Sequence, residues 1–301
     1  MKLGTARSAS ILVFAGRTAF AQPAIDPNLP LRGGQLELQA LFGVSTTPFD
    51  VTSLPEAKGQ AFVFLTGGRY SLSEALSLEL RVPLVLGSVA QPAGSYVDTA
   101  ALGNPGLGAR YRFVDWRAGA STLALSGAVE VGAPLASHGE NLMPNRVLAI
   151  ADGIEGRGHP EWFTPGVVPI TPSTTLRWAA APWSLETELR LPLLARVSEA
   201  SLPSSGSNTQ SFGVATVVGL EARYRLSQRL SVASAAQLFF DLVPAVEHVR
   251  DLSRVQDFER LSLHIHFGSL AALAVDLQTA IAGELGGSTV AFGLRAGLNL
   301  R

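Results

Sequence analysis

The sequence predicts an all-β protein: a single up-and-down barrel of twelve antiparallel strands that crosses a membrane. Of its 301 residues, 47% are hydrophobic and 16% are charged. The mean hydropathy of +0.26 is high for a water-soluble protein. After the N-terminus, however, no stretch approaches the ~18 consecutive apolar residues of a membrane helix. Apolar residues instead alternate with small or polar ones, as they do in the strands of outer-membrane barrels.

The clearest alternation lies at the C-terminal end, in Ser288–Arg301. Its apolar positions recur at every second residue: Val290, Phe292, Leu294, Ala296, Leu298 and Leu300. Successive side chains of a strand point to opposite faces, so this segment has one apolar face and one small or polar face. Inside a bilayer every strand edge must be paired. We therefore expect this closing strand to pair with the first strand, Gly34–Val44.

The same alternation places ten further strands between these two. They are Gln60–Tyr70, Ala75–Leu86, Pro105–Phe113, Ser121–Ala133, Pro172–Ala180, Trp183–Arg196, Phe212–Leu226, Leu230–Asp241, a strand through Leu261, Leu263, Ile265 and Phe267, and Ala271–Ala282. Proline within a strand removes a hydrogen-bond donor, so Pro83 predicts a bulge or the frayed end of its strand.

Long and short connections alternate along the chain. The long ones are rich in Gly, Pro and Ser or in charged residues, and cover 46–59, 87–103, 134–171, 198–210 and 242–257. Outer-membrane barrels have brief periplasmic turns and longer extracellular loops. With both chain ends in the periplasm, every long connection falls on the extracellular side. The 134–171 loop is the longest, and loops of this length are usually functional or mobile.

The N-terminus predicts export. It combines a positive start, a short apolar core at Ile11–Ala15 and an A-x-A cleavage site at 19–21. We therefore expect a signal peptide at 1–21, a periplasmic segment at 22–33 and the barrel at 34–301. The expected location is the outer membrane of a Gram-negative bacterium, with outer-membrane lipid and, during biogenesis, the barrel-assembly machinery as partners.

Charged side chains share the face opposite the apolar one. On a lipid face a charge costs about 2–4 kcal/mol near the midplane, so these residues are expected to line the interior. By parity they are Glu37, Arg69, Glu79, Arg81, Arg110, Arg112, Glu130, Arg177, Glu186, Glu188, Arg190, Glu221, Arg223, Arg225, Asp276 and Arg295, together with His264 and His266. They have two compatible interpretations: a structural filling of ion pairs, or the lining of a wet pore.

Aromatic residues gather at one end of the predicted strands. Tyr70, Tyr111 and Tyr224 end strands beside short turns, and Trp178 and Trp183 flank another short turn. Amphipathic rings favour the level of the lipid headgroups. These five residues therefore predict a periplasmic aromatic girdle.

The chain shows few signals of cofactor or nucleic-acid chemistry. Its net charge of -1 argues against a nucleic-acid partner, and it has no cysteine. It has no phosphate-binding glycine loop, nucleophile elbow or zinc spacing, so no cofactor or metal is expected. On one strand Ser262, His264 and His266 share a face, which leaves a rim enzyme conceivable. In the longest loop two more histidines and two glutamates are expected to be solvated: His138, His159, Glu140 and Glu161.

Three segments carry a family resemblance. Leu78–Leu84 (LELRVPL), Leu102–Phe113 (LGNPGLGARYRF) and Gly127–Leu135 (GAVEVGAPL) resemble the early strands of the phenol meta-pathway outer-membrane protein family. In that family, a strand ending before proline leads through a glycine-rich turn into G-x-G-x-[KR]-Y-[RK]-F. The resemblance covers residues 34–135. It implies a barrel that gives passive passage to small hydrophobic or aromatic molecules.

Three functions follow from these observations. The first is passive passage of a small-molecule solute, without catalysis. The alternative is a surface-exposed structural or interaction barrel that acts through its long loops, above all 134–171. The third is an outer-membrane lipid-modifying enzyme at the rim.

Overall fold

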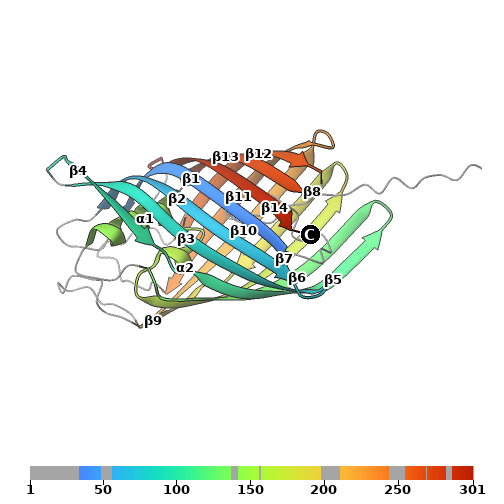
Figure 1. Ribbon diagram of the computed structural model, residues 1–301, viewed down its shortest axis with the longest axis horizontal. Helices are drawn as coiled ribbons and strands as arrows, with labels where there is room; N and C mark the ends of the chain where they lie inside the picture. The colour runs from blue at the N-terminus through green and yellow to red at the C-terminus, as the bar shows by residue number, and fades with distance from the viewer. Residues whose placement is uncertain are drawn as a thin grey trace, which may run out of the picture.

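The strands form a closed antiparallel ring in the computed structural model (Figure 1). It describes residues 34–48, 56–91, 93–136, 142–155, 157–197, 211–243, 255–268, 270–282 and 287–300. The predicted signal peptide at 1–21 and the segment at 22–33 lie outside the described residues.

Twelve strands of the described residues build the wall. They are β1 (Gly34–Pro48), β2 (Glu56–Ser71), β3 (Leu76–Ala90), β5 (Gly106–Ala118), β6 (Ser121–Gly132), β7 (Val167–Ala180), β8 (Trp183–Arg190), β10 (Phe212–Arg225), β11 (Leu230–Val243), β12 (Val255–Phe267), β13 (Ala271–Ala282) and β14 (Val290–Leu300). Two shorter strands, β4 (Tyr96–Leu102) and β9 (Leu193–Arg196), extend β5 and β8 toward the end of the long loops. The predicted twelve-stranded, all-β barrel is confirmed.

The ring closes where the sequence predicts. β1 pairs with β14 from Gly34 opposite Leu300 to Val44 opposite Val290, without a register shift. On the far side, β10 pairs with β11 and completes the circle. Closure pairs each of the twelve wall strands on both sides over most of its described length, which a sheet in lipid requires.

Alternation sorts the side chains as expected. Large apolar residues on the outer face are highly exposed, for example Leu107 at 62% and Leu261 at 60%. A water-soluble surface rarely carries such continuous apolar cover, whereas the lipid-facing band of an outer-membrane barrel does. Neither helix among the described residues has the length and apolar character of a membrane span.

Several predicted loops are shorter than the composition indicated. In 46–59, β1 continues to Pro48 and β2 already begins at Glu56, with Ser45 opposite Gly59. In 242–257, β12 begins at Val255. Most of 87–103 is a hairpin, in which β3 continues to Ala90 and β4 returns from Tyr96. The loop predictions were wrong at these places because strand pairing overrides the turn preference of Gly and Ser.

One wall strand is broken between β4 and β5. β3 pairs with β5 up to Arg81 opposite Gly106, and with β4 from Leu84 opposite Leu102. Pro83 lies at this change of partner, and its carbonyl oxygen accepts the Gly103 N–H at 3.0 Å. The expected bulge or frayed end is wrong, because Pro83 stays in register with Leu65 of β2 and β3 continues beyond it. Its carbonyl can still accept a hydrogen bond, although proline has no N–H to donate.

A second break separates β8 from β9 at Leu191-Pro192, within the predicted strand Trp183–Arg196. The preceding strand, predicted from Pro172, begins at Val167, because its first residues pair with β9. Beside the first residues of β7, β6 has already ended, at Gly132. No described strand therefore lies between β4 and the start of β7.

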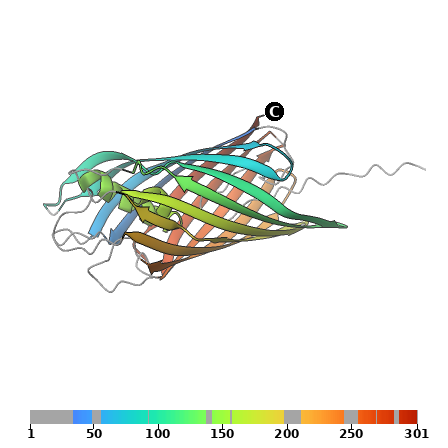
Figure 2. The same ribbon diagram turned by 90° about the horizontal axis from the view of Figure 1, so that it is seen from below.

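Two helices fill the barrel beside this region, α1 (Leu142–Ile154) and α2 (Pro160–Phe163). Figures 1 and 2 show both helices within the outline of the ring, near the end where β4 lies. The prediction of a wholly irregular 134–171 loop was therefore wrong. We call residues 142–155 and 157–164 the plug.

Candidate functional site

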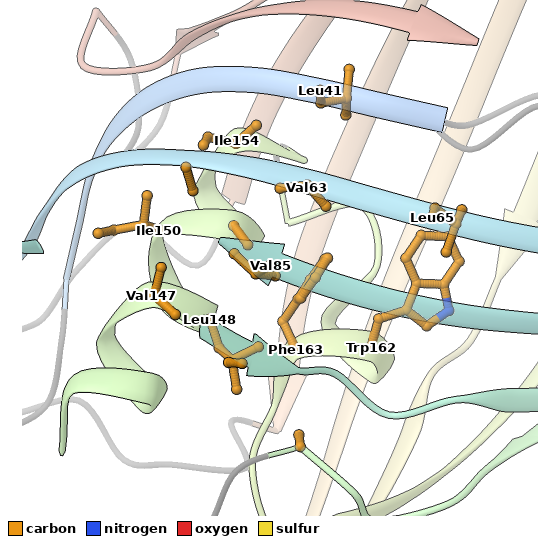
Figure 3. Packing of buried hydrophobic residues seen from close by; sticks show 14 of the residues in the cluster. Leu41, Val63, Leu65, Val85, Val147, Leu148, Ile150, Ile154, Trp162 and Phe163 are labelled. Atoms are coloured by element: carbon orange, nitrogen blue, oxygen red, sulfur yellow. The ribbon is translucent and has the colours of Figure 1, made fainter. Parts of the chain in front are cut away.

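The plug is held partly by an apolar contact between α1 and the wall. Val147, Leu148, Ile150, Ala151 and Ile154 have no exposed surface. Figure 3 shows Val147, Leu148, Ile150 and Ile154 of α1 close to inward-facing residues of β1, β2 and β3, namely Leu41, Val63 and Val85. Leu65 of β2 lies beside Trp162 of α2. The spacing of the buried residues along α1 gives one apolar stripe, which is typical of a helix that packs on a single face.

α2 is a short, polar part of the plug. Proline at the first helical position suits Pro160, since the missing N–H would have no helical partner there. The Thr164 hydroxyl donates to Pro160 O at 2.7 Å and ends the helix. His159 and Glu161 are buried, at 2% and 3% exposure. Their expected solvation was wrong, because the loop turns into the barrel. His138 and Glu140 lie outside the described residues.

Most of the charged residues expected inside are buried. The buried ones are Glu79, Arg110, Arg177, Glu186, Glu188, Arg190, Glu221, Arg223, His264, His266, Asp276 and Arg295. The half-buried ones are Glu37, Arg69, Arg81, Arg112, Glu130 and Arg225. Their role as the lining of a pore stays a prediction.

Glu79 is the centre of one ion-pair network. Its carboxylate accepts hydrogen bonds from Arg110 Nε at 2.9 Å and Arg69 Nε at 3.0 Å. Arg81 lies 3.7 Å from Glu79 and 3.4 Å from Glu130, so it links β3 to β6. Charges removed from water are tolerated only when they are paired in this way.

A second network lies on the opposite wall. Arg295 holds Asp276 in a bidentate pair, with N–O distances of 2.6 and 2.7 Å. Glu221 is shared by Arg223 at 2.9 Å and Arg260 at 3.1 Å. Arg260 was not among the predicted lining residues, although its parity with His264 and His266 was a signal for it. The strand was predicted only from Leu261 onward, whereas β12 begins at Val255, so the prediction left Arg260 in the loop.

Small cavities lie on both sides of the Glu79–Arg81 pair. One, of about 30 Å³, lies toward the plug and is bordered by His159, Glu161 and Arg190 as well as the pair. A second, also of about 30 Å³, lies toward the short-turn end and is bordered by Glu37 and Arg69. Each cavity is large enough to hold at least one water molecule.

The residues of the predicted girdle face outward. Tyr70, Tyr111, Trp178 and Trp183 are exposed. Tyr224 is half-buried against Trp183, with ring centroids 4.7 Å apart. That these rings mark the headgroup level remains a prediction.

The Ser–His constellation differs from its expected arrangement. His266 Nε2 lies 3.1 Å from Ser231 Oγ on β11, not against Ser262. Both ring nitrogens of His264 are buried without a hydrogen-bond partner. Asp276, the carboxylate opposite Ser262, is bound by Arg295. Within the described ranges, no group of three or more His, Asp or Glu is placed to hold a metal.

Comparison with known proteins places this architecture among outer-membrane barrels. The chain is similar to the COG4313 outer membrane channel from Pseudomonas putida F1, with a TM-score of 0.62 and 16% identity, over 91% of this chain and 98% of that one. It is also similar to the NanC porin, with a TM-score of 0.52 and 6% identity, over 88% of this chain and 100% of the porin.

A third similar structure is the transport unit of the autotransporter AIDA-I from Escherichia coli, with a TM-score of 0.50 and 9% identity, over 92% and 93% of the two chains. No protein-family profile matches the sequence, and no curated protein matches it. At these identities the likeness shows the fold. The resemblance to outer-membrane channels is confirmed at that level.

Proposed function

We propose that the protein is an outer-membrane channel for passive passage of small hydrophobic or aromatic solutes, and that the plug controls this passage. One observation carries the proposal: the barrel encloses a filling made from its own chain. Wall side chains alone fill the interior of about eight strands, while sixteen or more leave an aqueous channel. A twelve-stranded ring lies between these limits, and here α1 and α2 occupy the remaining space.

The solute class is supported by the plug and by the sequence resemblance. The α1 stripe and the inner faces of β1–β3 form an apolar surface inside the lumen. The charged networks lie farther along, toward the short turns. A solute that followed the plug would meet apolar side chains first and polar ones later. We further propose export by the 1–21 signal peptide and insertion by the barrel-assembly machinery.

Solute flux into protein-containing liposomes tests the proposal. The wild type is compared with a variant in which residues 142–164 are replaced by a short Gly-Ser linker. We expect slow entry of small solutes in the wild type and faster entry in the variant, since the variant lacks the plug. Heat-dependent gel mobility serves as the control for a folded barrel. If neither folded protein admits any solute or carries any current, the channel proposal is wrong.

The surface-barrel alternative has less support. It required the 134–171 loop to face outward, whereas α1 and α2 are buried in the barrel. An enzyme at the rim would need a serine, a histidine and a carboxylate in contact. Among the described residues, His266 contacts Ser231, and Asp276, the carboxylate opposite Ser262, is bound by Arg295. We therefore favour passage over catalysis.

A further inference from the structure

Asn104, in the break between β4 and β5, binds the plug through its side chain and its backbone. The side-chain contacts to the plug come from its amide nitrogen, which donates to Glu161 O at 3.0 Å and Thr164 O at 2.9 Å. Its side-chain oxygen accepts the N–H of Ala136, which precedes the plug, at 2.8 Å. Its backbone N–H donates to Trp162 O at 2.7 Å. A residue in an unbroken strand would have used this backbone group in the sheet. The break therefore frees wall groups to bind α2.

Trp162 is enclosed by wall and plug groups together. Its indole stacks on the His159 imidazole, with ring centroids 3.4 Å apart and planes at 5°. The Arg81 guanidinium carbon lies 5.6 Å from the indole centroid, within cation–π range. The indole N–H donates to Glu130 Oε1 at 3.2 Å. Trp162 thus connects α2 to both β3 and β6.

Glu161 connects α2 to a third wall strand. Its Oε1 accepts from Arg190 Nη1 of β8 at 3.1 Å and lies 3.1 Å from His159 Nδ1. Arg190 also donates to Gly158 O. Burial raises the pKa of Glu161, and the Arg190 charge opposes this rise. The contact therefore combines charge pairing with hydrogen bonds to the plug backbone.

The two helices are held by different forces. α1 relies mainly on apolar contact, which is not directional, and its C-terminal end accepts hydrogen bonds from Gln278 and Gln39 of the wall. α2 relies on directional polar contacts, and each partner left without its bond inside the barrel is costly. Removing a few polar groups should therefore release α2 while leaving the wall intact.

We propose that α2 is a clasp that keeps the plug in the lumen, and that breaking the clasp frees the plug to move. The clasp comprises His159, Glu161 and Trp162 of the plug with Arg81, Asn104, Glu130 and Arg190 of the wall. That the clasp regulates passage of solutes rests on the proposed channel function. That the clasp holds the plug in the lumen does not. The clasp is an autoinhibitory contact built into the chain.

The test measures plug movement separately from passage. The chain has no cysteine, so Ala151→Cys places a unique thiol on the fully buried face of α1. Folded protein in lipid vesicles is treated with a small water-soluble maleimide, and the labelling rate is followed. Asn104→Ala and Trp162→Ala are made in this background. Asn299→Ala is the matched control, a buried wall asparagine that bonds to Gln35 of β1.

We expect labelling about tenfold faster in both clasp variants, the change produced by losing a few net hydrogen bonds. The control should label at the parent rate. Unchanged labelling in both clasp variants, with the barrel folded by gel mobility, overturns the clasp. Faster labelling without any gain in solute flux keeps the clasp and counts against the channel.

Glu161→Gln covers the case in which the alanine variants fail to insert. It keeps the shape of the side chain and removes the charge that pairs with Arg190. Labelling should accelerate, though less than with Trp162→Ala, because the indole contacts remain. A rate equal to that of the parent would contradict the part assigned to Arg190.

Discussion

At the scale of single residues, we expect Glu155 to make docking of the plug sensitive to pH. It follows α1, has no exposed surface and accepts a hydrogen bond from Gln39 of the wall at 3.2 Å. Burial raises the pKa of Glu155 from 4.5 to about 8, although the charges of Arg260 and Arg295 oppose the rise. Docking therefore favours the protonated carboxyl.

The sign of this pH dependence follows from linkage. The pKa of Glu155 is 4.5 in a released plug and about 8 in the docked plug, so between these pH values the docked plug binds more protons. Docking therefore weakens as pH rises from about 4.5 to about 8. We expect the labelling rate at Ala151→Cys, divided by that of the same protein with Glu155→Gln, to increase between about pH 6 and pH 9. The ratio removes the intrinsic pH dependence of the thiol. A flat ratio would show that Glu155 does not govern docking.

Glu79 provides a prediction about stability. Replacing it with Gln leaves Arg69 and Arg110 without their shared carboxylate inside the wall. Loss of one partner of a buried pair costs about 3–5 kcal/mol. Unfolding by urea in lipid vesicles measures the change. Asp115→Asn, which weakens the pairs of an exposed carboxylate with Arg112 and Arg117, should cost no more than about 1 kcal/mol. Equal losses would contradict the buried role of Glu79.

At the scale of elements, the break between β4 and β5 fits α2 closely. A Cβ on Gly103 would lie 2.5 Å from Trp162 O and 2.7 Å from Pro83 Cγ. Gly103→Ala should therefore displace α2 and accelerate labelling at Ala151→Cys. Gly68→Ala is the control, since the added methyl would find only Gln35 O, at 3.8 Å. An unchanged rate in the Gly103 variant would show that the wall yields instead of the plug.

The same elements show what the sequence could predict and what it could not. The alternation of apolar and polar residues located the wall strands, because burial on one face of a strand repeats at every second residue. The plug was missed because Pro, Gly and Asn in 134–171 favour loops, although Val147, Leu148, Ala151 and Ile154 keep helical spacing. A second signal was available. The ends of β1–β3 nearest the long loops are apolar on both faces. An apolar inner face must pack against other apolar side chains inside the barrel.

The candidate site was predictable in part. Residues such as Arg110 and Asp276 followed from strand parity alone. Asn104 and Trp162 did not, because their partners Thr164 and Glu130 lie 60 and 32 residues away along the chain. A motif such as LGNPGLG predicts a turn from its Gly and Pro residues. It does not indicate that the turn sits in a wall strand and binds a helix.

At the scale of the whole molecule, the outer apolar band should tolerate charge according to depth. Leu261 lies near the middle of β12 on the outer face, and Leu242 lies near the long-loop end of β11. Leu261→Arg should cost about 2–4 kcal/mol of stability in lipid, and Leu242→Arg about 0–1 kcal/mol. Urea unfolding in vesicles compares the two. Similar costs would place the membrane differently along the barrel.

The pairing of β1 with β14 also sets an order of assembly. Residues 34 and 300 meet across the seam, so the ring cannot close until β14 has been synthesised. The plug lies between β6 and β7, near the middle of the chain. Contacts so distant in sequence form slowly. The wall residues of the clasp lie on β3, β6 and β8 and in the break before β5, so their contacts with the plug can form before β14 closes the ring.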